Sequence, residues 1–135
     1  MTRVVPGVVD VVVVRRVRRA WRVLILQRAA GTRSPRSWEH VHGHIEARER
    51  PAAAGRRELR EETGMVAGRL YSVTVNAFYL NRTDTVQLAL AFAAVVTSSR
   101  FVLGPEHAAG RWVTFAAARK VLAWPRDREL LDHVA

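Results

Sequence analysis

The sequence predicts a single α/β domain in which strands and helices form layers, and three observations lead to this fold class. The chain of 135 residues has the length of one compact domain with one hydrophobic core. Hydrophobic residues make up 49% of the chain and charged residues 25%, a balance that excludes wholesale disorder. Strand-like segments dominate, with one helical segment in the middle and more helical sequence near the end. We therefore expect one domain that covers residues 1–135.

Two strands joined by a tight connection are expected at the start of the chain. Residues 8–14 are β-branched almost throughout, and residues 21–27 form a second apolar run. The basic residues 15–19 between them are interpreted as a solvated hairpin tip, with a nucleic-acid patch as the alternative. Residues 28–37, which contain glycine, serine and proline, predict a loop.

A helix is expected over Pro51–Thr63. Proline suits the first helical position, and Gly64 suits the residue just past the helix end. Gly55 inside this helix indicates either close packing or tolerance of a residue that costs roughly 1 kcal/mol relative to alanine. Before the helix, the short extended segment 38–41 is expected to end in a turn at Gly43.

The second half of the chain is expected to contain three strands and two short helices. The expected strands are 70–80, 85–97 and 111–115, with a loop at 98–110. The expected helices are 116–122 and 127–134. Thr114 precedes the first of these helices and suits the N-cap position.

The charge balance is strongly basic, yet half of the acidic residues lie in one short stretch. The chain has 22 basic and 12 acidic residues, and six of the acids lie within residues 39–62. The net charge of +10 favours polyanionic partners. Every basic residue except Lys120 is arginine, however, which a compositional bias would also produce. The absence of cysteine excludes disulfides, a thiol nucleophile and a thiolate metal site.

No segment is expected to cross a membrane. The apolar residues 4–14 are interrupted by Asp10 and are too few for a spanning helix, and no cleavage site follows them. We therefore expect a cytoplasmic protein without a membrane partner. The oligomeric state stays open at this point, a homodimer included.

Three glutamates in the predicted helix share one face. Glu58, Glu61 and Glu62 stand at positions i, i+3 and i+4. Such like charges repel by roughly 0.2–0.5 kcal/mol per pair, and the helix dipole disfavours anions near a C-terminus. A divalent cation would reverse both effects, because Mg²⁺ prefers oxygen ligands such as carboxylates. The alternative is a solvated acidic helix end that neighbouring arginines neutralise.

A longer motif contains these glutamates. Gly43 is followed after five residues by Glu49, and after seven more by the run Arg57-Glu58-Leu59-Arg60-Glu61-Glu62-Thr63-Gly64-Met65. The pattern matches the Nudix box at every defined position, so the chain resembles the Nudix hydrolase family. A chance match is on the order of one in a billion per starting position by average residue usage.

The resemblance implies a fold and an activity. The implied fold is an α/β/α sandwich with a mixed sheet, in which the box helix carries the acidic site. The implied activity is hydrolysis of a nucleoside diphosphate linked to another group, by metal-activated attack of water on phosphorus. The cofactor would be Mg²⁺, with Mn²⁺ as a substitute. The partner would be a small nucleoside polyphosphate, and nucleic acid falls behind it.

The resemblance also assigns the metal ligands and the residues that support them. Glu58, Glu61 and Glu62 are the expected ligands, together with a backbone carbonyl at His42 or Gly43. Arg57 is expected to orient the glutamates, since a guanidinium fork can hold carboxylates in fixed geometry. The expected structural positions of the box are Gly43, Glu49, which pairs with Arg57, and Gly64.

A general base and several substrate contacts complete the expected site. The base is either Glu106, in the loop before the last strand, or Glu58, and we favour Glu106. Contacts to the substrate are expected from Arg28 and His44. Aromatic side chains that could stack on a base are Trp38 and Phe78, with ordinary core packing as the alternative.

The C-terminal part is similar to the nucleoside triphosphate pyrophosphohydrolase members of the family. The similarity rests on Glu106-His107, on the strand 111–113 and on Trp124-Pro125. It implies a (d)NTP or related triphosphate that is cleaved to a monophosphate and pyrophosphate. The alternative is a catalytically weak Nudix-fold module that binds nucleotide or RNA through its arginines.

Overall fold

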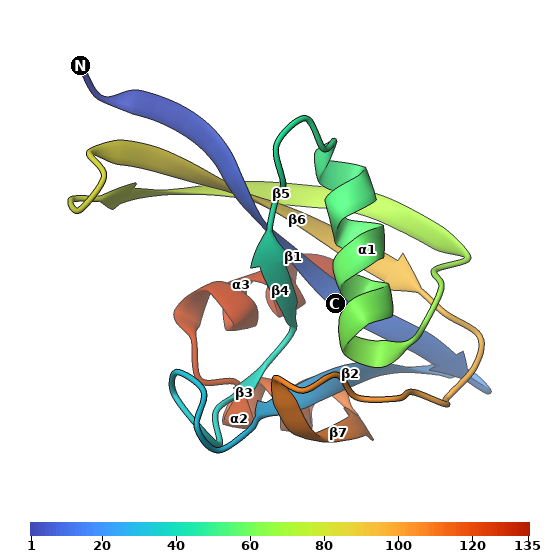
Figure 1. Cartoon of the computed structure of the whole chain (residues 1–135). Coiled ribbons are helices and arrows are strands. Elements are labelled where there is room, and N and C mark those ends of the chain that lie inside the picture. The colour runs from blue at the N-terminus through green and yellow to red at the C-terminus, as the bar shows by residue number, and fades with distance from the viewer.

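A seven-stranded mixed sheet forms the centre of the protein in the computed structural model, which describes residues 1–135. The strands are β1 (Arg3–Val17), β2 (Ala20–Arg28), β3 (Trp38–Glu39), β4 (Val41–His44), β5 (Arg69–Leu80), β6 (Thr85–Val95) and β7 (His107–Val113). The main path of the sheet is β3-β2-β1-β6-β5, while β4 pairs with β1 and β7 with β2 (Figure 1). The helices are α1 (Pro51–Thr63), α2 (Phe115–Val121) and α3 (Pro125–Val134).

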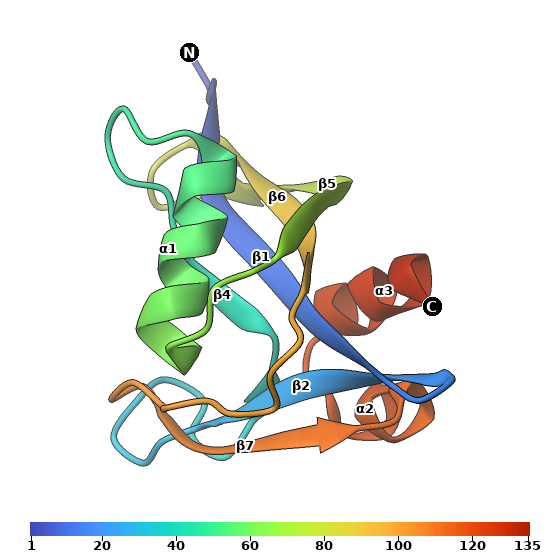
Figure 2. The same cartoon turned by 90° about the vertical axis from the view of Figure 1, so that its right-hand side faces the viewer.

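The helices cover the strands from two sides, which confirms the predicted α/β/α layering. Figure 2 shows α1 on one side of the strands and α2 with α3 on the other. Each side has its own apolar core. Leu59 of α1 packs into one core cluster, and Leu130 and Leu131 of α3 pack into the other. None of the three helices is long and apolar enough to cross a membrane.

Strand β1 is the central element because it is buried on both faces. Its valines alternate, so that Val11 and Val13 belong to the core under α1 while Val12 and Val14 belong to the core under α2 and α3. The strand runs parallel to β6 along almost its whole length and antiparallel to β2 and β4. It changes partner along one edge, from β4 at residues 8–11 to β2 at residues 13–17.

Most of the predicted elements are confirmed. β1 and β2 form the expected antiparallel hairpin. The helix Pro51–Thr63 has the predicted bounds, and it ends at Gly64, whose φ of 70° is left-handed and whose N–H donates to the Arg60 carbonyl. Thr114 caps α2, because its hydroxyl accepts a hydrogen bond from the Ala117 N–H at 3.1 Å.

Two local predictions are wrong. Gly43 does not form a turn: it lies inside β4 and pairs with Val9 of β1. Glycine leaves room there for the carboxyl group of Glu58, which a Cβ would displace. The last strand also begins earlier than expected, at His107, because β2 extends far enough for Arg28 to pair with it.

Gly55 is tolerated rather than required. A Cβ at this position would lie 3.5 Å from side-chain atoms of Phe92 and Val11, which is ordinary van der Waals contact. Gly55→Ala should therefore raise the free energy of unfolding by up to about 1 kcal/mol, because alanine is the better helix former. Urea unfolding of the two proteins measures the difference. A less stable variant would mean that the packing around this helix turn is tighter than these distances indicate.

Candidate active site

Arg57 of α1 holds the segment before the helix against the helix itself. Its Nε and Nη2 donate to the two carboxylate oxygens of Glu49 at 2.8 and 2.9 Å, and Nη2 also donates to the His44 carbonyl at 2.8 Å. Its Nη1 donates to Glu58 at 2.8 Å. The hydrogen bonds from Arg57 lower the pKa of Glu49 to about 2. The guanidinium group thus fixes the carboxylate of Glu49, which precedes the helix, and that of Glu58, which lies on the helix.

Glu62 is the most confined carboxylate of the helix. The residue is 4% exposed, and both of its carboxylate oxygens lack a hydrogen-bond partner. Burial raises the pKa of Glu62 well above its usual range, and the nearby carboxylates of Glu58, Glu106 and Glu39 raise it further. A buried carboxylate without partners is costly. A cation is the partner that would relieve both the burial and the repulsion.

The loop before β7 packs against the C-terminal turn of α1. The Val102 N–H donates to the Thr63 carbonyl at 2.8 Å, and the Gly104 N–H donates to the Glu62 carbonyl at 3.3 Å. A Cβ on Gly104 would approach the Glu61 carbonyl oxygen to 2.7 Å, so glycine permits this contact. These bonds satisfy carbonyl groups that a helix end otherwise leaves free.

The same loop completes a small hollow of about 340 Å³, which we call the acidic cleft. It is lined by Glu58, Glu61, Glu62, Gly104, Pro105 and Glu106. The structure therefore brings the three helix glutamates and Glu106 together, although Glu106 is distant from them in the sequence.

The residues of the acidic cleft fit a divalent cation. All four carboxylates offer the oxygen ligands that such ions prefer, and both oxygens of Glu62 are unpartnered. No three acidic or histidine side chains converge on one point as the side chains stand. Arg57 engages Glu58 and Glu61, the latter at 3.2 Å. A bound cation would compete with Arg57 for these two carboxylates.

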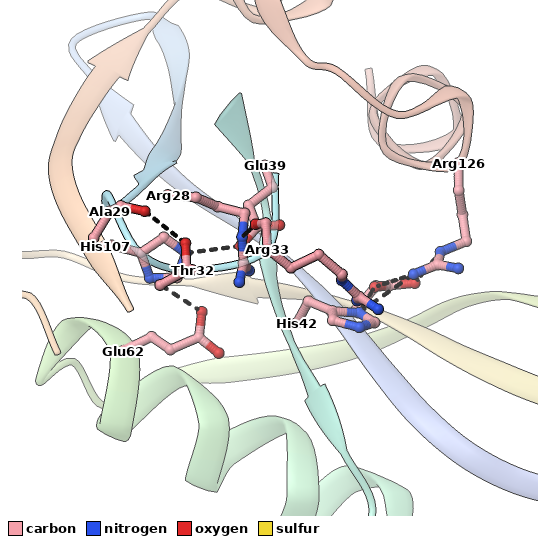
Figure 3. Close-up of polar contacts among 10 residues, drawn as sticks. Arg28, Ala29, Thr32, Arg33, Glu39, His42, Glu62, His107 and Arg126 are labelled. Carbon is pink, nitrogen blue, oxygen red and sulfur yellow. Dashed lines mark hydrogen bonds and ion pairs between the residues drawn. The ribbon is translucent and has the colours of Figure 1, made fainter. Parts of the chain in front are cut away.

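A second, larger hollow of about 500 Å³, here called the polar pocket, lies between β4 and the start of α3. It is lined by Asp10, Arg28, Arg33, Ser34, Glu39, His42, Trp124, Pro125, Arg126 and Asp127. Figure 3 shows several of these side chains, with Arg33 and Arg126 extending toward His42 from opposite sides. Only Arg28 among them is an expected substrate contact, so sequence reasoning missed most of this pocket.

Asp10 organises one wall of the polar pocket. It is 1% exposed, accepts a hydrogen bond from His42 Nδ1 at 2.6 Å and forms an ion pair with Arg126 Nε at 2.8 Å. Burial alone would raise the pKa of Asp10, but His42 and Arg126 outweigh it and lower the pKa. The sequence did carry a signal for this role. A lone carboxylate in a strand of valines must be paired if both faces of the strand are buried.

Asp127 at the start of α3 lines the same pocket, but its pKa is shifted in the opposite direction from that of Asp10. Burial and the negative charges of Asp10 and Glu39 raise the pKa of Asp127 to about 7. Its Oδ2 is buried and has no hydrogen-bond partner. A pKa of about 7 lets Asp127 carry a proton at neutral pH, which lowers the cost of burying its carboxyl group without a partner.

The other expected substrate contacts lie outside both hollows. The His44 side chain is exposed and lines neither of them. Trp38 packs against the core under α2 and α3, where the Arg111 guanidinium lies 5.5 Å from its ring centre. Phe78 reaches the polar pocket indirectly, because Arg126 lies 5.5 Å from its ring centre.

Comparisons with known proteins agree with the motif. The NUDIX domain model matches residues 5–134, so the chain belongs to the Nudix family. It is a Nudix hydrolase, and the family generally uses a divalent metal to hydrolyse nucleoside diphosphates linked to another group. No curated protein matches the chain by sequence.

Solved structures with the same fold have low sequence identity to this chain. The NUDIX domain of Shewanella oneidensis NrtR, solved with ADP ribose, has a TM-score of 0.79 at 14% identity, covering 99% of this chain and 87% of that one. The Escherichia coli dihydroneopterin triphosphate pyrophosphohydrolase has a TM-score of 0.72 at 23% identity, covering 92% of each chain. A Caenorhabditis elegans Ap4A hydrolase has a TM-score of 0.77 at 19% identity, covering 94% and 93%. These likenesses establish the fold.

Gly43→Ala tests the close approach of β4 and α1. The added Cβ would displace the Glu58 carboxylate, so turnover should fall by roughly 10- to 100-fold, the range typical of positions that orient a metal ligand. Steady-state rates with Mg²⁺ measure the loss, and circular dichroism checks the fold. Gly55→Ala is the matched control and should keep full turnover. Unchanged turnover in Gly43→Ala would show that the Glu58 position is not critical.

Proposed function

We propose that the protein hydrolyses a nucleoside triphosphate, ribo- or deoxyribo-, to a monophosphate and pyrophosphate with Mg²⁺, or with Mn²⁺ in its place. The observation that carries this proposal is the pairing of the acidic cleft with the polar pocket. One hollow offers carboxylates for cations, and the other offers polar groups of both signs. A nucleoside triphosphate has two matching parts: a polyphosphate that binds cations and a nucleoside that forms hydrogen bonds.

The two hollows suggest how the substrate is oriented. The polyphosphate would lie at the acidic cleft, where bound cations neutralise its charge. The nucleoside would enter the polar pocket, where the guanidinium groups of Arg33 and Arg126 line the hollow and can donate hydrogen bonds. Arg28 also lines this pocket, where it donates a hydrogen bond to Glu39. We expect its guanidinium group to contact the phosphates of a substrate that spans both hollows.

The residues of the acidic cleft would divide the chemical work. Glu58, Glu61 and Glu62 would hold the cation, with a backbone carbonyl at His42 or Gly43 as a further ligand. When bound, the cation supplies a Lewis acid that stabilises charge on phosphate oxygens and lowers the pKa of water. Arg57 would keep Glu58 and Glu61 in place, and the attacking water would lose its proton to a carboxylate.

The triphosphate class has support from a relative and from the C-terminal segment. One structural relative is a dihydroneopterin triphosphate pyrophosphohydrolase, whose length this chain matches almost completely. The chain also resembles such members at Trp124-Pro125, which lines the polar pocket. The other relatives, an ADP-ribose complex and an Ap4A hydrolase, define the competing substrates.

A nucleotide panel tests the proposed function. The wild-type protein with Mg²⁺ should release pyrophosphate from a (d)NTP faster than phosphate, and faster than it cleaves ADP-ribose or diadenosine tetraphosphate. The double variant Glu61→Gln/Glu62→Gln should release neither product, since two expected ligands lose their charge. Equal rates for wild type and double variant, together with salt-sensitive RNA binding, would favour a binding module instead.

Glu106→Gln tests the general base. Glu106 makes no side-chain hydrogen bond, whereas Glu58 already accepts one from Arg57, so Glu106 is freer to take a proton. We expect turnover to fall by about 100-fold or more, as for the loss of other general bases. Mn²⁺ affinity should stay unchanged, because Glu106 is not an expected metal ligand. A loss of less than tenfold would leave Glu58 as the base.

A further inference from the structure

A buried histidine lies between the acidic cleft and the polar pocket. His107 is the first residue of β7, and its side chain is fully buried. Its Nε2 lies 2.8 Å from Oε2 of Glu39, which lines the polar pocket. Its Nδ1 lies 3.7 Å from Oε1 of Glu62, which lines the acidic cleft (Figure 3). The two hollows are thus joined through one imidazole ring.

The Glu39 contact fixes the orientation of the ring. Burial alone would raise the pKa of Glu39, but His107 and Arg28 outweigh it and lower the pKa, so Glu39 is ionised and accepts the hydrogen bond from Nε2. With Nε2 committed to Glu39, Nδ1 faces Glu62. Imidazoles held by a carboxylate in this way are a common device for setting ring orientation near a metal site.

The contact between His107 and Glu62 is made by two groups that have no other partner. His107 Nδ1 and both Glu62 oxygens are buried and without a hydrogen bond. At 3.7 Å the two groups lie just beyond hydrogen-bond distance. A small movement would let Nδ1–H donate to the Glu62 carboxylate when both ring nitrogens carry a proton. The backbone favours this contact, since the loop before His107 is bonded to the C-terminal turn of α1 at the Glu62 carbonyl.

Another buried histidine provides a contrast. His40 is 1% exposed, but its Nε2 lies 3.1 Å from the Asp127 carbonyl and it forms no ion pair with a carboxylate. Burial lowers the pKa of His40 to about 4, so it stays neutral. His40 therefore has a packing role, whereas His107 connects two carboxylates on different elements.

We propose that His107 is a positioning residue that holds the Glu62 carboxylate in the orientation in which the acidic cleft binds a divalent cation. Glu39 and Arg28 support the ring from the polar-pocket side, so the chain Arg28–Glu39–His107–Glu62 links the two hollows. The inference rests on the proposed function, because it concerns the metal of that site. By this inference the affinity for the cation depends on His107, a residue that lies outside the Nudix box.

Two amide substitutions separate the two nitrogens of the ring. The amide nitrogen of His107→Gln can occupy the Nε2 position and retain the contact to Glu39, but it leaves Glu62 without its partner. The amide group of His107→Asn can occupy the Nδ1 position and retain the contact to Glu62. We expect His107→Gln to weaken Mn²⁺ binding by about 10- to 100-fold, and His107→Asn to weaken it less.

The measurement is a Mn²⁺ titration followed by electron paramagnetic resonance, which reports metal affinity independently of activity. Excess Mg²⁺ should also restore much of the turnover of His107→Gln, because the defect lies in metal binding. His40→Phe is the control: it should lower stability and leave Mn²⁺ affinity unchanged. Circular dichroism checks that each variant is folded.

The outcomes distinguish this inference from the proposed function. Wild-type affinity in both folded His107 variants overturns the inference, and so does an equal loss of affinity in His40→Phe. A wild-type protein that binds Mn²⁺ and hydrolyses triphosphates keeps the proposed function in either case. A wild-type protein that binds no Mn²⁺ overturns both.

Discussion

Four carboxylates, those of Glu58, Glu61, Glu62 and Glu106, lie close together at the C-terminal turn of α1. The surrounding structure has to offset the repulsion among them. The helix dipole adds to this repulsion, because the helix presents its carbonyl end to the acids. Arg57 offsets part of the charge by holding Glu49 and Glu58 at once. Glu62 is buried without partners, and its burial and the neighbouring acids raise its pKa. Such a site favours a cation, because a bound metal ion would give Glu62 the positively charged partner that no arginine or lysine of the protein provides.

The second organising feature is the change of partner along one edge of β1. The strand pairs first with β4 and then with β2, and the polar pocket draws residues from all three strands. Asp10 lies on β1 within the stretch that pairs with β4, where it holds His42 of β4 and Arg126 of α3. The pocket therefore depends on an ionic group in the most buried strand of the protein. The sheet topology gives the pocket its polar character, because it brings charged residues of β1, β2 and β4 together.

The fold and the box could be predicted from sequence because their signals are local. Valine runs, the proline at the start of α1 and the glycine at its end lie beside the structure they determine. The polar pocket could not be predicted, since Asp10 and Arg126 are far apart in the chain and only the sheet brings them together. Gly43 misled for a physical reason: glycine usually signals a turn, whereas here it makes room for a side chain from another element. The role of Glu106 as the base, and those of Glu58, Glu61 and Glu62 as ligands, stay predictions.

The glycines of the site have a consequence for how the motif itself is interpreted. Gly43 makes space for a carboxylate, and Gly64 closes a helix in a left-handed conformation. Gly43 thus serves the Glu58 side chain, whereas Gly64 serves the backbone at the helix end. The box therefore combines residues that join the helix to its surroundings, Glu49 and Arg57 among them, with the glutamates expected to hold the cation.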